Sequence, residues 1–204
     1  MSVADLYRNR GVNPLAVAGA TITFPSTADT LIAAGANADT NFSTGVGFQC
    51  TPDTVPAWSL IAFDVSAAFP KPFTVVVATL RLYTYVVAAS RTITAYRLLR
   101  TTWVENQATW NIYKTGSSWG TVGCGSTTTD YTIADAATSA SVAVSIWQEW
   151  DITKQVQTAI DSVSGKVHIF LKDAGSVVAV DNAWRSKEYT TESLRPQLVV
   201  YGHP

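Results

Sequence analysis

Residues 74–87 constrain the fold of this chain more than any other stretch. They read TVVVATLRLYTYVV, in which the apolar residues Leu80 and Leu82 alternate with the larger, more polar residues Arg81 and Tyr83. A period of two indicates a β-strand with one face on a core, because successive side chains point to opposite faces. The stretch therefore predicts one long strand that is half covered.

Short β-branched or aromatic runs, separated by Gly, Pro, Asp, Asn and Ser, recur from residue 21 onward and predict further strands. The run at 57–65 is apolar on both faces, so we expect it to be covered on both sides. The run at 91–100 follows a short Ala-Ala-Ser turn and predicts an antiparallel hairpin with 74–87. The remaining strands are expected at 21–24, 30–32, 46–50, 141–152, 166–173 and 196–202.

One segment departs from this pattern. Ile152, Val156 and Ile160 recur every four residues, which predicts a short helix over 152–162. Residues 101–135 are expected to be mainly loop. We predict an all-β fold, an antiparallel two-sheet β-sandwich of jelly-roll type with one short helix. Its expected core includes Trp58, Phe63, Leu80, Leu82, Ile146 and Val199.

The first twenty residues differ from the rest. Alternating charges give way to Gly11, Asn13 and Pro14, which break regular structure, so we expect an arm at 1–20 and one sandwich domain at 21–204. We expect the arm to mediate assembly, because it offers apolar anchors and two arginines to a partner. These residues are Leu6, Tyr7, Arg8, Arg10 and Leu15.

Charge and hydropathy exclude several function classes. The 14 basic and 15 acidic side chains give a net charge of −1 and form no run, so no nucleic-acid partner is expected. No apolar stretch approaches the ~20 residues that a membrane-spanning helix needs. The N-terminus shows no recognisable secretory signal, which predicts a protein that is not exported by that route.

No motif in the chain predicts catalysis, a cofactor or a metal. The GCGS sequence at 123–126 lacks the spacing of a nucleophile elbow, and His168 lies alone inside a predicted strand. Four residues at 29–41 offer oxygen atoms, but their spacing does not match a calcium-binding loop and favours turn capping: Asp29, Asn37, Asp39 and Asn41. We therefore expect a protein that is not an enzyme.

Two residue sets remain open to alternative interpretations. Cys50 and Cys124 form either one disulfide or two separate buried thiols. Trp103, Trp110 and Trp119 suit either a sugar-stacking platform or an ordinary core.

Three stretches together resemble one family. The most specific is TTWVENQATWNIYKTGSSWG at 101–120, and the other two are ADTLI with NFSTG at 28–45 and LIAFDVSAAFP with ATLRLYTY at 60–70 and 78–85. The closing segment WRSKEYTTESLRPQLVVY at 184–201 adds to the resemblance. They are similar to the DNRLRE-type β-sandwich domains, which include alginate-binding carbohydrate-binding modules and virion-associated domains. Phe42 and Ser43 depart from the family's turn, which removes support for a ligand site there.

The resemblance implies a jelly-roll sandwich whose long loops are tied down by the motif's own side chains. In this chain the residues concerned are Trp103, Glu105, Asn106, Trp110, Trp119, Arg185, Glu188 and Arg195. We expect Glu105 to pair with Arg185 or Arg195, because a buried single charge is costly.

The first functional expectation is a non-catalytic virion structural protein, such as a phage capsid decoration or fibre-like surface protein. It would be made in the host cytoplasm, form a homo-oligomer, with a trimer as one option, and bind the major capsid protein or other virion subunits. The alternative is a free-standing, extracellular carbohydrate-binding module that recognises a polysaccharide. A third reading is a surface fragment of a larger adhesin.

Overall fold

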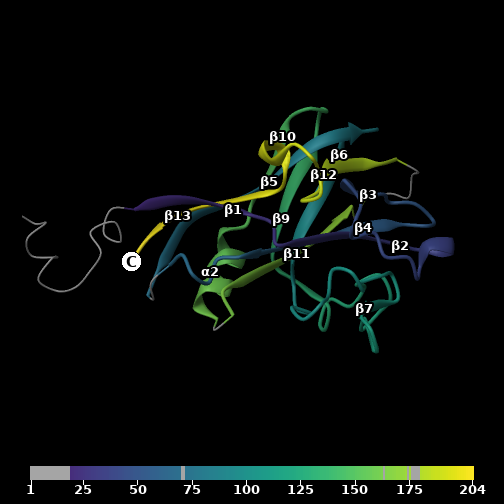
Figure 1. Ribbon diagram of the computed structural model, residues 1–204, viewed down its shortest axis with the longest axis horizontal. Helices are drawn as coiled ribbons and strands as arrows, with labels where there is room; N and C mark the ends of the chain where they lie inside the picture. The colour runs from purple at the N-terminus through teal and green to yellow at the C-terminus, as the bar shows by residue number, and fades with distance from the viewer. Residues whose placement is uncertain (1–18, 70–71, 163, 174, 176–179) are drawn as a thin grey trace, which may run out of the picture.

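The computed structural model describes residues 19–69, 72–162, 164–173, 175 and 180–204. Two antiparallel sheets pack face to face and confirm the predicted β-sandwich (Figure 1). The predicted arm residues Leu6 to Leu15 lie outside the described residues. Within the described part of the chain, no helix is long and apolar enough to cross a membrane.

The first sheet has six strands. Its order is β1 (Ala20–Pro25), β13 (Gln197–His203), β5 (Thr74–Val87), β12 (Asn182–Arg185) and β3 (Gly47–Cys50), and β10 (Trp147–Asp151) also pairs with β5. β13 and β12 therefore lie end to end along one side of β5, and β10 lies along the other. The predicted long strand is thus the centre of this sheet.

The second sheet has five strands. Its order is β2 (Ala28–Ala33), β4 (Ala57–Asp64), β11 (Lys166–Asp173), β6 (Arg91–Leu98) and β9 (Tyr131–Ser141). The predicted helix is α2 (Thr153–Asp161), which links β10 to β11. The minor elements are a small hairpin of β7 (Ile112–Lys114) and β8 (Ser117–Ser118), and 3-10 turns η2 (Gly35–Asn37) and η3 (Glu192–Leu194).

The connection from β5 to β6 corrects one prediction. We expected a hairpin, but β5 lies in the six-stranded sheet and β6 in the five-stranded sheet. Most consecutive strands cross from one sheet to the other in the same way, for example β1 to β2, β3 to β4, and β9 to β10. The Ala-Ala-Ser bend is therefore a crossover between layers. A local turn signal cannot distinguish the two outcomes.

The core between the sheets contains Phe63, Leu80 and Leu82, each fully buried, as predicted. Two of the predicted core residues are wrong. Ile146 is 38% exposed, because it lies in the bend before β10, where its carbonyl accepts hydrogen bonds from Thr84. Val199 points outward and is half-buried, because its neighbours Leu198 and Val200 take the inward positions of β13.

Residues 99–130 cover the outer face of the five-stranded sheet. This is why β4 is buried from Ala57 to Phe63 on both faces, as its sequence predicted, and why Trp58 is buried. The indole of Trp103 donates a hydrogen bond to His168 on β11, which fastens the loop to the sheet. Figure 1 shows the β7 hairpin and its neighbouring loops beneath β11 and β4, with β10, β12 and β13 on the opposite side.

Candidate functional site

The outward side chains of the six-stranded sheet form the candidate site. Along β5, Leu80, Leu82 and Thr84 point into the core, so Arg81, Tyr83 and Tyr85 point outward. Neighbouring strands add side chains to the same face. We call this set the outer platform: Arg81, Tyr83, Tyr85, Trp147, Glu149, Arg185, Tyr189 and Gln197.

Arg81 lies at the centre of the outer platform and is held in one orientation. The strand register places it between Glu149 on β10 and Gln197 on β13. Its Nε donates to Glu149 Oε1 at 2.7 Å, and its Nη1 donates to Gln197 Oε1 at 3.3 Å. Its guanidinium carbon also lies 4.7 Å from the ring centre of Trp147. The arginine is therefore preorganised by a carboxylate, an amide and an indole.

Trp147 is the tryptophan that the fold places on this outer face. It pairs with Tyr83 across the strands, and the two rings meet edge to face with centroids 5.4 Å apart. Trp110 is half-buried against the core. The other five tryptophans are buried: Trp58, Trp103, Trp119, Trp150 and Trp184. Trp147 is thus the indole best placed to meet a ligand.

A second arginine lies between two tyrosine rings. The guanidinium carbon of Arg185 is 4.1 Å from the ring centres of both Tyr85 and Tyr189. Gly47 allows this arrangement, because a Cβ there would lie 2.5 Å from the Tyr85 hydroxyl. Burial raises the pKa of Tyr85, so this phenol stays neutral and can donate a hydrogen bond. Arg185 makes no ion pair within the part of the chain that the structure describes.

The outer platform combines aromatic rings with rigid hydrogen-bonding groups. Such a surface can stack against the C–H face of a polar ring while its guanidinium, amide and carboxylate groups contact hydroxyls at the edge of that ring.

A cluster of acidic residues lies elsewhere, where residues 99–130, which we call the long loop, meet β2. Oxygens of Asp29, Glu105 and Glu188 lie within 4.8 Å of one another. The Lys187 ammonium contacts Glu105 Oε1 at 3.2 Å and also pairs with Glu188. This ammonium already supplies the positive charge that a metal ion would bring. Burial, assisted by the negative charges of Glu188 and Glu105, raises the pKa of Asp29 to about 7.

The cluster corrects the predicted pairing of Glu105. Its carboxylate contacts Lys187 and accepts a 2.7 Å hydrogen bond from the backbone N–H of Asp29, and it does not pair with either expected arginine. Arg185 stacks between tyrosines, and Arg195 donates to the Tyr189 carbonyl at 2.7 Å and pairs with Glu192. A lysine adjacent to Glu188 reaches the site because the 186–196 segment turns back toward β2.

The remaining motif residues have different environments. Trp103 and Trp119 are buried, and Trp119 donates to the Thr109 carbonyl at 2.9 Å. Trp110 packs on Gly123, whose φ is +72° and where a Cβ would lie 2.4 Å from the indole. The three tryptophans thus form the interior of the long loop. Asn106 is exposed.

The structure resolves the state of the two cysteines and shows the role of Asn41. Cys50 and Cys124 are separate, buried thiols. Asn41 caps a turn, because its side-chain oxygen accepts from the Ser43 N–H at 3.1 Å. Its amide nitrogen also donates to the carbonyls of Glu105 and Ala108, which anchors the long loop.

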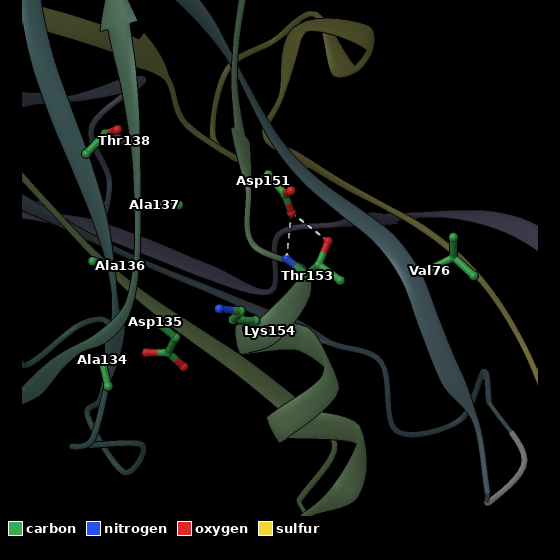
Figure 2. A pocket seen from close by; sticks show the side chains of 9 residues that line it. All are labelled: Val76, Ala134, Asp135, Ala136, Ala137, Thr138, Asp151, Thr153 and Lys154. Carbon is green, nitrogen blue, oxygen red and sulfur yellow. Dashed lines mark hydrogen bonds between the residues drawn. The ribbon is translucent and has the colours of Figure 1, made fainter.

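A pocket of about 500 Å³ lies beside the platform, at the edge of the sandwich (Figure 2). We call it the edge pocket. Strand β9 forms one wall, and the end of β10 with the start of α2 forms another. It is lined by Val76, Ala134, Asp135, Ala136, Ala137, Thr138, Asp151, Thr153 and Lys154.

Sequence reasoning missed both the outer platform and the edge pocket. The alternation along β5 predicts that Arg81 and Tyr83 lie on one face, so this part of the outer platform could be predicted from the sequence. The neighbours of these residues come from β10, β12 and β13, which lie far away in sequence. No local pattern indicates which strands pair with β5.

Comparison with the models of known protein families identifies a family. The model of carbohydrate-binding module family 96 matches residues 20–202, which include every strand from β1 to β12 and nearly all of β13. A search of curated proteins finds no significant match.

Proposed function

Because the chain belongs to carbohydrate-binding module family 96, we propose that it is a non-catalytic module that binds a polysaccharide on its outer platform. The family match supports this reading better than the virion role that the sequence first suggested. The virion location, the capsid partner and the homo-oligomer stay predictions.

One observation carries the assignment of the site. Arg81 is fixed by Glu149, Gln197 and the ring of Trp147 before any ligand arrives. A group already held in its binding orientation loses little conformational entropy on binding, so more of the contact energy becomes affinity. The outer face of the five-stranded sheet is covered by residues 99–130, whereas the outer platform faces solvent with half-buried aromatic rings.

The charges of the outer platform favour an acidic polysaccharide. Glu149 balances Arg81, but Arg185 has no carboxylate partner within the described residues. Its stacked guanidinium offers the planar fork that pairs with a carboxylate through two hydrogen bonds. The resemblance to alginate-binding modules points to the same class of ligand.

Affinity electrophoresis tests the proposal. The wild-type protein is run through gels that contain alginate, polygalacturonate, xylan or hydroxyethylcellulose. We expect retardation by an acidic polysaccharide, and we expect Trp147→Ala to weaken the apparent affinity on the order of tenfold or more, the scale of a lost aromatic anchor.

Tyr113→Ala is the matched control, because Tyr113 is a half-buried aromatic in the β7 hairpin on the opposite side of the sandwich. It should be retarded like the wild type. A wild-type protein that migrates freely in every gel would contradict the proposed function. Equal retardation of wild type and Trp147→Ala would contradict the proposed site.

A further inference from the structure

The edge pocket continues the outer platform along β10. Gln148 and Trp150 are buried, so Trp147, Glu149 and Asp151 share the outward face of this strand. Asp151 lines the edge pocket. At ~3.4 Å per residue, the pocket begins about 14 Å from Trp147 along the strand. A ligand that lies on the platform and follows β10 reaches the pocket directly.

Asp135 gives the pocket an unmet hydrogen-bonding group. Its side chain is only 9% exposed, and its Oδ2 pairs with Arg97 Nε at 2.6 Å. Its Oδ1 is buried and has no hydrogen-bond partner within the described residues. Buried acceptors are nearly always paired, because an unpaired one forfeits its hydration without compensation. Asp135 is therefore a group for which a ligand hydroxyl would be a favourable partner.

Lys154 faces Asp135 from the other wall. Figure 2 shows the Lys154 side chain, from the first turn of α2, extending toward the wall formed by β9, which carries Asp135. No ion pair joins them, and Lys154 makes none with any other described residue. A cationic donor and a carboxylate thus lie in opposite walls of one pocket. A hydroxyl group matches both, since it accepts one hydrogen bond and donates another.

The other walls narrow the class of ligand. Small apolar side chains line part of the pocket and leave room for the C–H face of a ring. They belong to Val76, Ala134, Ala136 and Ala137. Lys154 and the nearby Arg97 disfavour a cation, and the carboxylates of Asp135 and Asp151 disfavour a small anion. A ring rich in hydroxyl groups can contact the apolar side chains with its C–H face and the charged side chains with its hydroxyls.

We propose that the edge pocket is a second subsite that binds one sugar residue of the chain whose other residues lie on the outer platform. This proposal rests on the proposed function and extends it. The protein then selects its ligand by length as well as by composition, because only a polysaccharide long enough to extend past Asp151 enters the pocket.

Calorimetric titration with oligosaccharides of increasing length tests this subsite. The probes run from disaccharide to hexasaccharide and are prepared from the polysaccharide that most retards the wild type. We expect the wild-type affinity to rise about tenfold once the ligand is long enough to enter the pocket, the scale of one or two hydrogen bonds to charged groups. Lys154→Ala and Ala136→Phe should remove that gain and leave the affinity for short oligosaccharides unchanged.

Two control variants match these changes. Lys114→Ala removes a lysine from the β7 hairpin, and Ala140→Phe adds the same ring to an exposed position of β9 outside the pocket. Both should keep the gain with length. The melting temperature of each variant establishes that it is folded.

The outcomes separate the two proposals. A gain with length that persists in Lys154→Ala and Ala136→Phe overturns the edge pocket, while a weaker affinity of Trp147→Ala at every length supports the platform. Loss of the gain in the pocket variants with no effect of Trp147→Ala supports the pocket and overturns the platform. No binding of any probe by the wild type overturns both.

Discussion

The indole nitrogen of Trp103 donates a hydrogen bond of 3.0 Å to Nδ1 of His168. This contact joins the long loop to β11, and Nδ1 can accept it only while the imidazole is neutral. Burial, assisted by the positive charge of the nearby Lys166, lowers the pKa of His168 to about 4. The junction between the loop and the five-stranded sheet therefore depends on pH.

Acidification should weaken the fold through His168. Between pH 6.5 and about 4, the histidine binds a proton in the unfolded chain but not in the folded one, so stability is full above pH 6.5 and falls as the pH is lowered. The shift corresponds to at most ~3 kcal/mol. Urea denaturation from pH 7 to pH 4 should show this loss in the wild type relative to His168→Gln. Parallel profiles of the two proteins would contradict the assignment.

Asp29 should act in the opposite direction. Its folded pKa is about 7 and its unfolded value is 3.8, so its contribution to stability is full below pH 3.8 and is lost as the pH rises through 7. Asp29→Asn keeps an oxygen that can accept from the Lys187 N–H. We expect the variant to exceed the wild type in unfolding free energy at pH 8 by about 1–3 kcal/mol, and the advantage to shrink toward pH 4. An advantage that is constant with pH would count against this account.

Asp130 should be the most sensitive carboxylate of the long loop. Its side chain is fully buried and accepts hydrogen bonds from the backbone N–H groups of Gly120, Thr121 and Ser126. Asp130→Asn replaces an acceptor oxygen by a donor and should lower the unfolding free energy by about 1.5–3 kcal/mol. Thermal denaturation measures the change, with the exposed Asp161→Asn as a control. Equal melting temperatures of the two variants would refute the role.

A double-mutant cycle distinguishes the observed partner of Glu105 from the expected one. Glu105 contacts Lys187, whereas the sequence suggested Arg185 or Arg195. Both partners of the observed pair are about one quarter exposed, so we expect a modest coupling energy of ~0.5–1 kcal/mol between Glu105→Ala and Lys187→Ala. The cycle of Glu105→Ala with Arg195→Ala should give no coupling. The reverse result would restore the original expectation.

The strands with strong alternation were predictable from the sequence. Residues 74–87 form β5 as expected, and 57–64 form a strand covered on both faces. The helix followed from the spacing of Ile152, Val156 and Ile160, all of which are buried. Each of these segments carries enough apolar surface for one periodicity to dominate.

Strand β9 was missed for a physical reason. Its sequence YTIADAATSAS is rich in alanine and serine, which have low β propensity, and it lies at the edge of its sheet with little apolar surface to bury. Its pairing with β6 creates the strand, and that pairing is not visible locally. β12 was also missed, because Asn182–Arg185 is too short to show a period.

The candidate site was the least predictable part. The tryptophans of the most specific motif, Trp103 and Trp119, are buried in the long loop. No local pattern singles out Trp147, because its surroundings form only when β10 pairs with β5 and brings it to Tyr83 and Arg81. Strand pairing across long sequence separations determines a surface of this kind.

The indole N–H signals in a two-dimensional NMR spectrum test the central claim most directly. The chain has seven tryptophans, and single Trp→Phe variants assign their signals. On addition of oligosaccharides from the retarding polysaccharide, we predict that the Trp147 signal shifts most, while those of the five buried tryptophans stay in place. Shifts centred on Trp103, Trp110 and Trp119, with Trp147 unchanged, would contradict a binding site on the outer platform.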